Sequence, residues 1–516
     1  MSSSEPPANR KRQVARKLFF GAEWESLAAR LQEESWLAWL QREIKRGGRG
    51  LLVSFVIHSL LLASLTFIVF QPRSSGDGEP VSATWLPQYI GPAKAPRRKF
   101  EIEQPFEIES APSTKRNEAT TAATTKTDET GGTAVPGVNP VGVGNSLGGR
   151  GAGLRAGGLE RIGGTPDAER AIKQGLLWLT RQQQSDGRWE LHQGYPDSGL
   201  STIKTDTGAT ALALMALLGH GNTHQTGDHA KVVAKGLKWL LATQDPATGD
   251  LHDQRQEEGR QPSIYAHAMA TIAVCEALAL TSDNELKPAA EQAVRYLLTA
   301  QHPIVGGWKY RVLLRESRGD LSVTGWALMA LHTARMAGIE VPPGDFERAS
   351  LFLDSVQVAG SARYKYEPSS PENKATAALT AEALLCRQWL GWPRNFQQMT
   401  AGVKYVTADE NLPSWSDGRR NVYGWYYTSQ MLHNLGGEEW KRWNLAVRSA
   451  IVKNQVTSGG NKPGMDTRGS WNPNSPRGEG EEYADKAGRL YLTALCVLTL
   501  ETPYRHQPIY PPTDAP

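Results

Sequence analysis

Carboxylates, aromatic rings and one histidine stand near the starts of a series of apolar segments. These residues are Asp206, Tyr265, His267, Asp320, Tyr423 and Trp425. If the segments are parallel helices, their amino ends meet at one face and bring these side chains together. Carboxylates and histidine can transfer protons, while helix amino ends with aromatic rings can hold a sugar or a peptide. Alternatively, Asp206 and Asp320 cap helices, the aromatic rings belong to the core, and His267 is a buried, hydrogen-bonded residue.

The cysteines and the charge balance narrow the chemistry further. The three cysteines, Cys275, Cys386 and Cys496, lie among Ala and Leu with no metal-binding or redox spacing. We therefore expect no metal site and no cofactor. The chain has 57 Lys+Arg against 53 Asp+Glu, and its carboxy-terminal two thirds carry no basic excess. A nucleic-acid partner is not expected.

A short signature of Gln, Gly and an aromatic residue recurs through residues 166–505. Its clearest copies are Gln184, Gly187 and Trp189; Gln244 and Gly249; Gln301, Gly306 and Trp308; and Gln455, Gly469 and Trp471. A degenerate copy runs from Gln357 to Tyr364, and the unit near residues 404–415 lacks the glutamine. Glutamine can satisfy backbone groups at a helix end, glycine permits the turn, and tryptophan stacks between units.

Each signature closes an amphipathic segment and precedes an apolar one. The amphipathic segments are 168–183, 230–243, 289–300, 346–356, 396–406 and 438–454; the apolar ones are 206–219, 264–280, 322–338, 374–391, 422–437 and 486–501. Apolar segments rich in Ala are typical of helices buried on both sides. The pattern predicts an all-α (α/α)6 toroid of six outer and six inner helices, because an open array would leave apolar faces uncovered.

The signature resembles the repeat of squalene-hopene cyclases and protein prenyltransferase β subunits. AIKQGLLWLTRQQQSDGRWE after a Gly-rich stretch, with AGRLYLTALCVLTLETPYRHQPIY at the end, also resembles membrane-anchored prenyltransferase/squalene-oxidase-repeat proteins of planctomycete type. The resemblance covers about residues 166–505 and implies the terpenoid cyclase toroid.

The catalytic motifs of those families are incomplete. The resemblance to the cyclases implies a motif of several aspartates at the start of an inner helix, which protonates the substrate. The corresponding residues here, Thr205-Asp206-Thr207-Gly208-Ala209, retain only one carboxylate. Two or three neighbouring carboxyl groups would change one another's pKa, and a single carboxyl group has no such neighbour. The Asp-x-Cys pair of the prenyltransferase zinc site does not occur. We therefore expect a binding or scaffolding module; the alternative is an enzyme acting on a polyisoprenoid or a polysaccharide.

The amino-terminal part predicts a membrane anchor. Residues 51–70 contain no charged residue, and their length matches a bilayer core. Residues 1–50 form a basic cytoplasmic segment with an amphipathic helix. The composition of residues 71–165, which are rich in Pro, Thr and Gly, predicts a disordered linker. The toroid follows at residues 166–505, and residues 506–516 form a tail. This organisation predicts a single-pass protein of the cell inner membrane with a periplasmic toroid.

Ser54 and His58 lie four residues apart inside the predicted span, and hence on one helical face. The string LLVSFVIHSLLL resembles the anchor of TonB-type energy-transducing proteins, which implies a motor complex as a partner beside the cytoplasmic membrane. Alternatively, His58 reaches the lipid headgroups. The ligand of the toroid is expected to be a glycan, a peptide or a lipid.

The topology can be tested with protease. Basic residues concentrate before the span, at Arg42, Lys45, Arg46 and Arg49, against Arg73 alone in the twenty residues that follow it. Because positive flanks stay in the cytoplasm, protease added to intact spheroplasts should remove the toroid and leave a short protected fragment. A fully protected toroid would contradict this orientation.

Overall fold

The computed structural model describes Leu147, Arg150 and residues 163–191, 202–256, 263–312, 319–459 and 466–510. Within these ranges the chain forms twelve α-helices and three short 3-10 helices, with isolated bridges in place of strands. The predicted segments 1–50 and 51–70, with Ser54 and His58, lie outside the described residues, as does most of 71–165.

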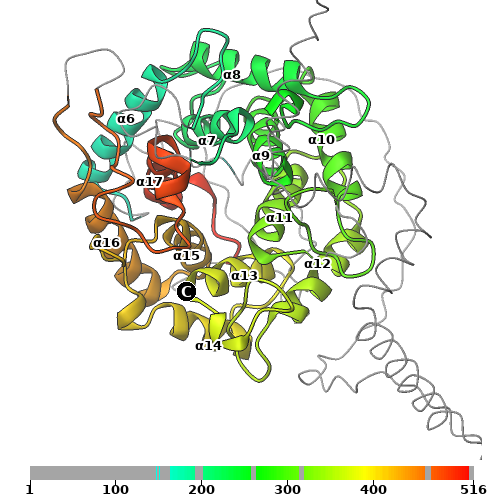
Figure 1. The fold of residues 1–516 in the computed structure, drawn as a ribbon, viewed down its shortest axis with the longest axis vertical. Helices are drawn as coiled ribbons and strands as arrows, with labels where there is room; N and C mark the ends of the chain where they lie inside the picture. Colours follow the sequence, from blue (N-terminus) through cyan, green and yellow to red (C-terminus); the bar gives the residue numbers. More distant parts are fainter. Residues whose placement is uncertain are drawn as a thin grey trace, which may run out of the picture. The chain divides into compact units, whose positions relative to one another are not determined.

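The helices form two concentric rings (Figure 1). The outer helices are α6 (Pro166–Arg181), α8 (Ala230–Thr243), α10 (Lys287–Thr299), α12 (Pro343–Val356), α14 (Gln397–Val406) and α16 (Gly437–Lys453). The inner helices are α7 (Asp206–Gly219), α9 (Ser263–Thr281), α11 (Leu321–Met336), α13 (Ala377–Trp389), α15 (Val422–Leu435) and α17 (Ala484–Arg505). The 3-10 helices are η3 (Gln254–Gln256), η4 (Glu372–Lys374) and η5 (Asp409–Asn411).

Each inner helix packs against the next inner helix in chain order, and α17 packs back against α7. The outer ring closes in the same way, because α16 contacts α6. Figure 1 shows the last inner helix lying beside the first outer and inner helices. The predicted (α/α)6 toroid is therefore confirmed.

Composition explains which helices lie inside. All fourteen residues of α7 are buried, and most of them are Ala or Leu. Small side chains let six helices approach one another around one axis. In α6, by contrast, only one face is buried, and Asp167 in its first turn is exposed while Glu169 turns inward to His220. The acidic first turn also suits the helix dipole.

The signature glutamines join consecutive outer helices. The side-chain amide of Gln244 donates to the carbonyl of Gly249 in its own loop at 3.0 Å and to that of Ala289 in α10 at 2.9 Å. Gln301 makes the equivalent pair of bonds to Gly306 and to Asp345 in α12. Each glutamine thus fastens its loop to the start of the next outer helix.

The first copy of this contact corrects the sequence prediction by one residue. Gln183, rather than Gln184, donates to Gly187 and to Val232 in α8, both at 2.9 Å. The amide of Gln184 reaches only the carbonyl of Gln182, at 3.4 Å. Three successive glutamines occur here, and only the middle one points toward α8.

The last copy closes the ring. Gln455 donates to the carbonyl of Gly469 at 2.8 Å and to that of Ala171 in α6 at 2.7 Å. The contact used between neighbours therefore also joins the last unit to the first.

The signature glycines allow the same helices to touch. Gly187 and Gly469 have φ of +104° and +90°, a region that favours glycine. A Cβ at Gly187 would collide with the carbonyl of Lys235 in α8, and one at Gly469 with the carbonyl of Gln174 in α6. Glycine is therefore required both by the backbone turn and by the close approach of the next outer helix.

The signature aromatic residues join outer and inner helices. Trp308 is fully buried. Its backbone N–H donates to the hydroxyl of Thr324 in α11 at 3.1 Å, and its indole N–H donates to the carbonyl of Leu297 in α10 at 2.8 Å. Trp189 and Trp471 make the same two kinds of bond. Each indole is thus buried with its polar atom satisfied.

The predicted linker 71–165 extends too far at its carboxyl end. The side chains of Leu147 and Arg150 are 2% and 1% exposed, and the guanidinium of Arg150 donates to Glu276 of α9 at 2.9 Å. The carbonyl of Gly163 accepts from Asn444 and Arg448 of α16. The linker prediction is therefore wrong for these residues. Arg150 is held in the toroid because the buried carboxylate of Glu276 needs a counter-charge.

The described part of the predicted tail, residues 506–510, continues along the toroid. The N–H of Ile509 donates to Asn434 of α15, and the hydroxyl of Tyr510 donates to the carbonyl of Trp392.

One helix of the described residues, α9, is long and apolar enough to cross a membrane. It is an inner helix of the toroid, and most of its apolar stretch is buried.

The glutamine contact can be tested with two adjacent substitutions. Gln183→Ala removes two hydrogen bonds and should lower the free energy of unfolding by about 1–3 kcal/mol. Gln184→Ala removes one long bond and should cost no more than about 0.5 kcal/mol. Urea unfolding of both variants measures the difference; equal losses would contradict the assignment of Gln183.

Candidate binding cavity

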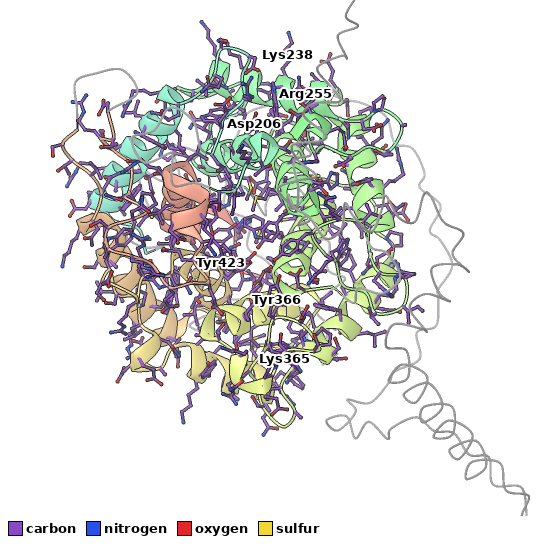
Figure 2. The ribbon with its side chains drawn as sticks, in the orientation of Figure 1. Asp206, Lys238, Arg255, Lys365, Tyr366 and Tyr423 are labelled. Carbon is purple, nitrogen blue, oxygen red and sulfur yellow. The ribbon has the colours of Figure 1, made fainter. Side chains whose placement is uncertain are left out.

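A cavity of about 1010 Å³ lies at the amino ends of the inner helices. Residues from all six inner helices or the turns before them line it. Six tyrosines stand in its wall: Tyr265, Tyr310, Tyr366, Tyr423, Tyr483 and Tyr491. Most of the remaining wall is apolar, including Leu212, Met269 and Leu379. In Figure 2, Tyr366 and Tyr423 lie toward the middle of the ring, whereas Lys238 of α8 points outward.

Two of the predicted ligand-binding residues meet in this wall. The hydroxyls of Tyr265 and Tyr423 are 3.1 Å apart and share a hydrogen bond. The hydroxyl of Tyr423 also lies 3.2 Å from both carboxyl oxygens of Glu382 in α13. A hydrogen-bonded chain therefore runs from a buried carboxyl group through Tyr423 to Tyr265, which lines the cavity.

Glu382 is a functional candidate that the sequence analysis missed. Its side chain is 0% exposed, and burial raises its pKa well above the usual range, although Tyr427 and Tyr423 oppose the shift. Gly325 of α11 makes room for it, since a Cβ there would collide with the carboxyl group. Burial therefore favours the protonated form of the Glu382 carboxyl group. The available signal was a single acidic residue in the apolar segment 374–391.

Tyr310 and Tyr366 were also missed, because they lie in turns between the predicted segments. Their hydroxyls are hydrogen-bonded to each other. The ammonium of Lys309 lies 5.6 Å from the ring centre of Tyr310 and 5.3 Å from that of Tyr366. Together they place a second tyrosine pair in the cavity wall.

Asp206 is not the cap of α7. The N-cap is Thr205, whose hydroxyl accepts from the N–H of Gly208 at 3.0 Å. Asp206 is the first helical residue, and its carboxylate lies 3.1 Å from the guanidinium of Arg188. Threonine and aspartate are both favoured at the N-cap position, so sequence alone could not distinguish the two residues.

Asp320 does cap a helix. Its carboxylate accepts from the N–H of Val323 in α11 at 2.9 Å and from the hydroxyl of Ser322 at 2.8 Å. Burial raises the pKa of Asp320, while the N–H of Val323 and the ammonium of Lys309 oppose the shift. These contacts account for a structural role.

His267 lies in the core rather than at the cavity. Its Nδ1 accepts from the N–H of Leu251 at 3.0 Å, and its Nε2 lies 3.0 Å from the carbonyl of Ala293. Its ring packs edge-on against Tyr296, with the ring centres 4.8 Å apart. In this unit Leu251 stands where the other units have the signature tryptophan. Its backbone N–H donates to His267, whereas the equivalent N–H groups of Trp189 and Trp308 donate to threonine hydroxyls.

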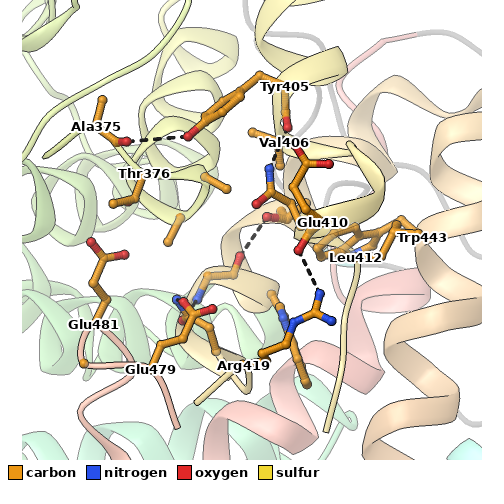
Figure 3. A pocket seen from close by; sticks show the side chains of 18 residues that line it. Ala375, Thr376, Tyr405, Val406, Glu410, Leu412, Arg419, Trp443, Glu479 and Glu481 are labelled. Carbon is orange, nitrogen blue, oxygen red and sulfur yellow. Dashed lines mark hydrogen bonds between the residues drawn. The ribbon is translucent and has the colours of Figure 1, made fainter. Parts of the chain in front are cut away.

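Trp425 lines a second, smaller pocket of about 480 Å³ between α13 and α15. Figure 3 shows Glu479 and Glu481 on one side of this pocket and Tyr405 on the other. The guanidinium of Arg419 donates to the backbone carbonyl of Glu410 at 2.9 Å. Trp425 thus lines a different pocket from Tyr265, although the sequence analysis grouped the two residues.

Buried charges fill the axis near the carboxyl ends of the inner helices. Arg150 and Arg505 both donate to Glu276, at 2.9 Å and 2.8 Å. Burial alone would raise the pKa of Glu276. The two guanidinium groups outweigh this effect and hold that pKa below its usual range. Arg505 also donates to the carbonyl of Met215 in α7 at 2.6 Å. These contacts tie α7, α9 and α17 together opposite the cavity.

Among the described residues, no group of three or more His, Cys, Asp or Glu side chains is placed to hold a metal ion. Cys275, Cys386 and Cys496 are buried. Burial raises the pKa of each thiol, so these groups stay protonated and inert.

The state of Glu382 predicts a pH effect on stability. Between the ordinary pKa of glutamate and the raised value, the native state keeps a proton that the unfolded chain has lost. The free energy of unfolding therefore falls as pH rises through that window. Glu382→Gln cannot lose this proton and should flatten the fall by up to about 1.4 kcal/mol per pH unit.

Urea unfolding at a series of pH values from about 5 to about 8 gives the free energy of unfolding of each protein and hence its slope against pH. Glu438→Gln, at an exposed position of α16, is the control and should follow the wild type. An unchanged slope in Glu382→Gln would show that Glu382 is ionised in the fold.

Comparison with known proteins begins with the squalene-hopene cyclase C-terminal domain family, which matches residues 150–266. No curated protein matches the sequence. The type II terpene cyclase MstE from Scytonema is a similar solved structure, with 17% identity over 65% of this chain and 97% of that chain and a TM-score of 0.42.

The α-1,6-mannanase GH76A from Salegentibacter sp. HEL1_6 has 13% identity over 65% of this chain and 98% of that chain, with a TM-score of 0.44. The family match starts at Arg150, whose guanidinium donates to Glu276 of α9. This chain thus carries a squalene-cyclase-like α/α toroid.

Proposed function

We propose that the toroid binds an elongated apolar molecule, such as a polyisoprenoid or another lipid, in the tyrosine-lined cavity. The observation that carries this proposal is the cavity of about 1010 Å³ at the amino ends of the inner helices. Its size is that of a ligand pocket, and such pockets combine apolar walls with a few placed polar groups. Here the polar groups are the six tyrosine hydroxyls together with other side chains, among them Ser322, Lys374 and Glu481.

The wall chemistry supports binding rather than acid-initiated cyclisation. Protonating an alkene requires a strong acid, but Asp206 is paired with Arg188. Burial raises the pKa of Glu382, which makes this carboxyl group a weaker acid than an ordinary glutamate. Its 0% exposure also keeps the carboxyl group behind Tyr423. We therefore propose a binding module, and treat cyclisation or polysaccharide chemistry as an outcome of the test.

We further propose that residues 51–70 anchor this module in the inner membrane and that the linker presents it in the periplasm. The uncharged span and its basic amino-terminal flank support this arrangement. A membrane location would also bring the cavity close to a source of apolar ligands. A TonB-type motor complex, suggested by Ser54 and His58, remains the proposed protein partner.

Binding can be tested by titrating the full-length protein with squalene and following tryptophan fluorescence. Ala266 lines the cavity, so Ala266→Phe fills part of it and should weaken binding at least about tenfold, since lost apolar contact of this size costs more than about 1.4 kcal/mol. Leu445→Phe, at an exposed site of α16, should bind as the wild type does.

The same samples decide between binding and catalysis. We expect no cyclic product from the wild type, and unchanged binding by Asp206→Asn. Undiminished binding by Ala266→Phe would contradict the proposed cavity. Cyclic product that disappears in Asp206→Asn would replace the binding function by an enzymatic one.

A further inference from the structure

Four hydroxyl groups gather at one place in the wall of the tyrosine-lined cavity. They belong to Tyr265, Tyr310, Ser322 and Tyr366, which all line the cavity, and we call them the hydroxyl patch. The rings of Tyr265 and Tyr310 are stacked with their centres 6.3 Å apart, and the hydroxyls of Tyr310 and Tyr366 are hydrogen-bonded to each other. Burial raises the pKa of all three tyrosines, and a hydrogen bond with Ser322 opposes the shift in each.

Backbone hydrogen bonds hold the turns that carry two of these tyrosines. The carbonyl of Tyr310 accepts from the N–H of Ile264 at 3.0 Å, and the carbonyl of Tyr366 accepts from the N–H of Leu321 at 2.8 Å. The turns before α11 and α13 are thereby fastened to the starts of α9 and α11. A group fixed in this way loses little conformational freedom when it binds a ligand.

Contacts within the wall leave part of the hydrogen-bonding capacity of the hydroxyl patch unused. Each hydroxyl has one proton and two lone pairs. In the pair of Tyr310 and Tyr366 one hydroxyl donates to the other, and the second keeps a proton of its own. Ser322 donates to a carboxylate and keeps its lone pairs. Tyr265 shares a single hydrogen bond with Tyr423. The patch can therefore both donate to and accept from a further oxygen atom.

The charged groups behind the hydroxyl patch already have partners. The ammonium of Lys309 lies 3.4 Å from the carboxylate of Asp320 and 3.2 Å from that of Glu367. Burial raises the pKa of Glu382 and so favours its uncharged form. An ionised group at the patch would lose its water and would compete with ion pairs that are already formed, which is costly in an apolar wall.

We propose that the ligand is an elongated apolar molecule with one uncharged oxygen group, an alcohol or a ketone, and that the hydroxyl patch binds this group. This inference rests on the proposed function and adds the chemistry of the polar end of the ligand. A ketone oxygen accepts from the patch, and an alcohol can also donate to it. A carboxylate or an ammonium group would have to be buried as a charge.

Probes of one chain length test the polar end on the full-length chain kept free of alkyl detergents. Dodecane, dodecanol, decyl methyl ketone, dodecanoate and dodecylamine differ only near one end of the chain. Titrations at neutral pH, below the concentrations at which the probes form micelles, follow tryptophan fluorescence. Dodecanol and the ketone should each bind at least about tenfold more tightly than either charged probe, because burying a charge costs more than that factor.

Two substitutions locate the contact. Tyr265→Phe and Tyr366→Phe each remove one hydroxyl of the patch and keep the ring. Each should lower the affinity for dodecanol relative to that for dodecane by about threefold to tenfold, the factor of one hydrogen bond. Because the ratio compares two probes on the same protein, a general loss of stability cancels. Tyr405→Phe is the matched control, since its hydroxyl donates to the carbonyl of Ala375 in the smaller pocket, and should leave the ratio unchanged.

The outcomes separate this inference from the proposed function. A ratio that stays unchanged in both patch variants, or equal or tighter binding of a charged probe than of dodecanol, would overturn the uncharged oxygen group alone. If none of the probes binds, dodecane included, the apolar cavity fails as a binding site as well.

Discussion

The toroid depends on the close approach of consecutive outer helices at the signature loops. Gly187 and Gly469 leave no room for a Cβ against the next outer helix, and a neighbouring glutamine donates to a carbonyl of that helix. Because Gln455 makes this contact with α6, the array closes into a ring. Closure turns six parallel inner helices toward one axis, so their amino ends surround a cavity and their carboxyl ends surround the Arg150–Glu276–Arg505 cluster.

Residue periodicity was sufficient for the fold but not for single positions. The apolar and amphipathic segments predicted the ring, because burial on one or two sides leaves a clear pattern. Spacing could not choose among Gln182, Gln183 and Gln184, since the choice depends on which amide faces α8. It also could not choose between Thr205 and Asp206 as a cap, because both residue types suit that position. These differences arise from side-chain direction, which the local sequence does not determine.

The polar interior was less predictable than the fold. Glu276 is balanced by Arg150 and Arg505, which lie far away in the sequence, one of them in a Gly-rich stretch typical of a linker. Glu382 meets Tyr423 and, through it, Tyr265 only because α9, α13 and α15 converge. An isolated acidic residue in an apolar segment was the local sign of both sites. Its partner, and hence its charge state, depends on the closed ring.

The central claim is that the tyrosine-lined cavity is a binding site for an elongated apolar molecule. An experimental density map of the full-length chain equilibrated with squalene tests it most directly. We expect continuous elongated density within the ring of inner-helix amino ends, in contact with Tyr265 and Tyr423. A cavity occupied by ordered water alone, or closed by collapse of the tyrosine side chains, would contradict the account.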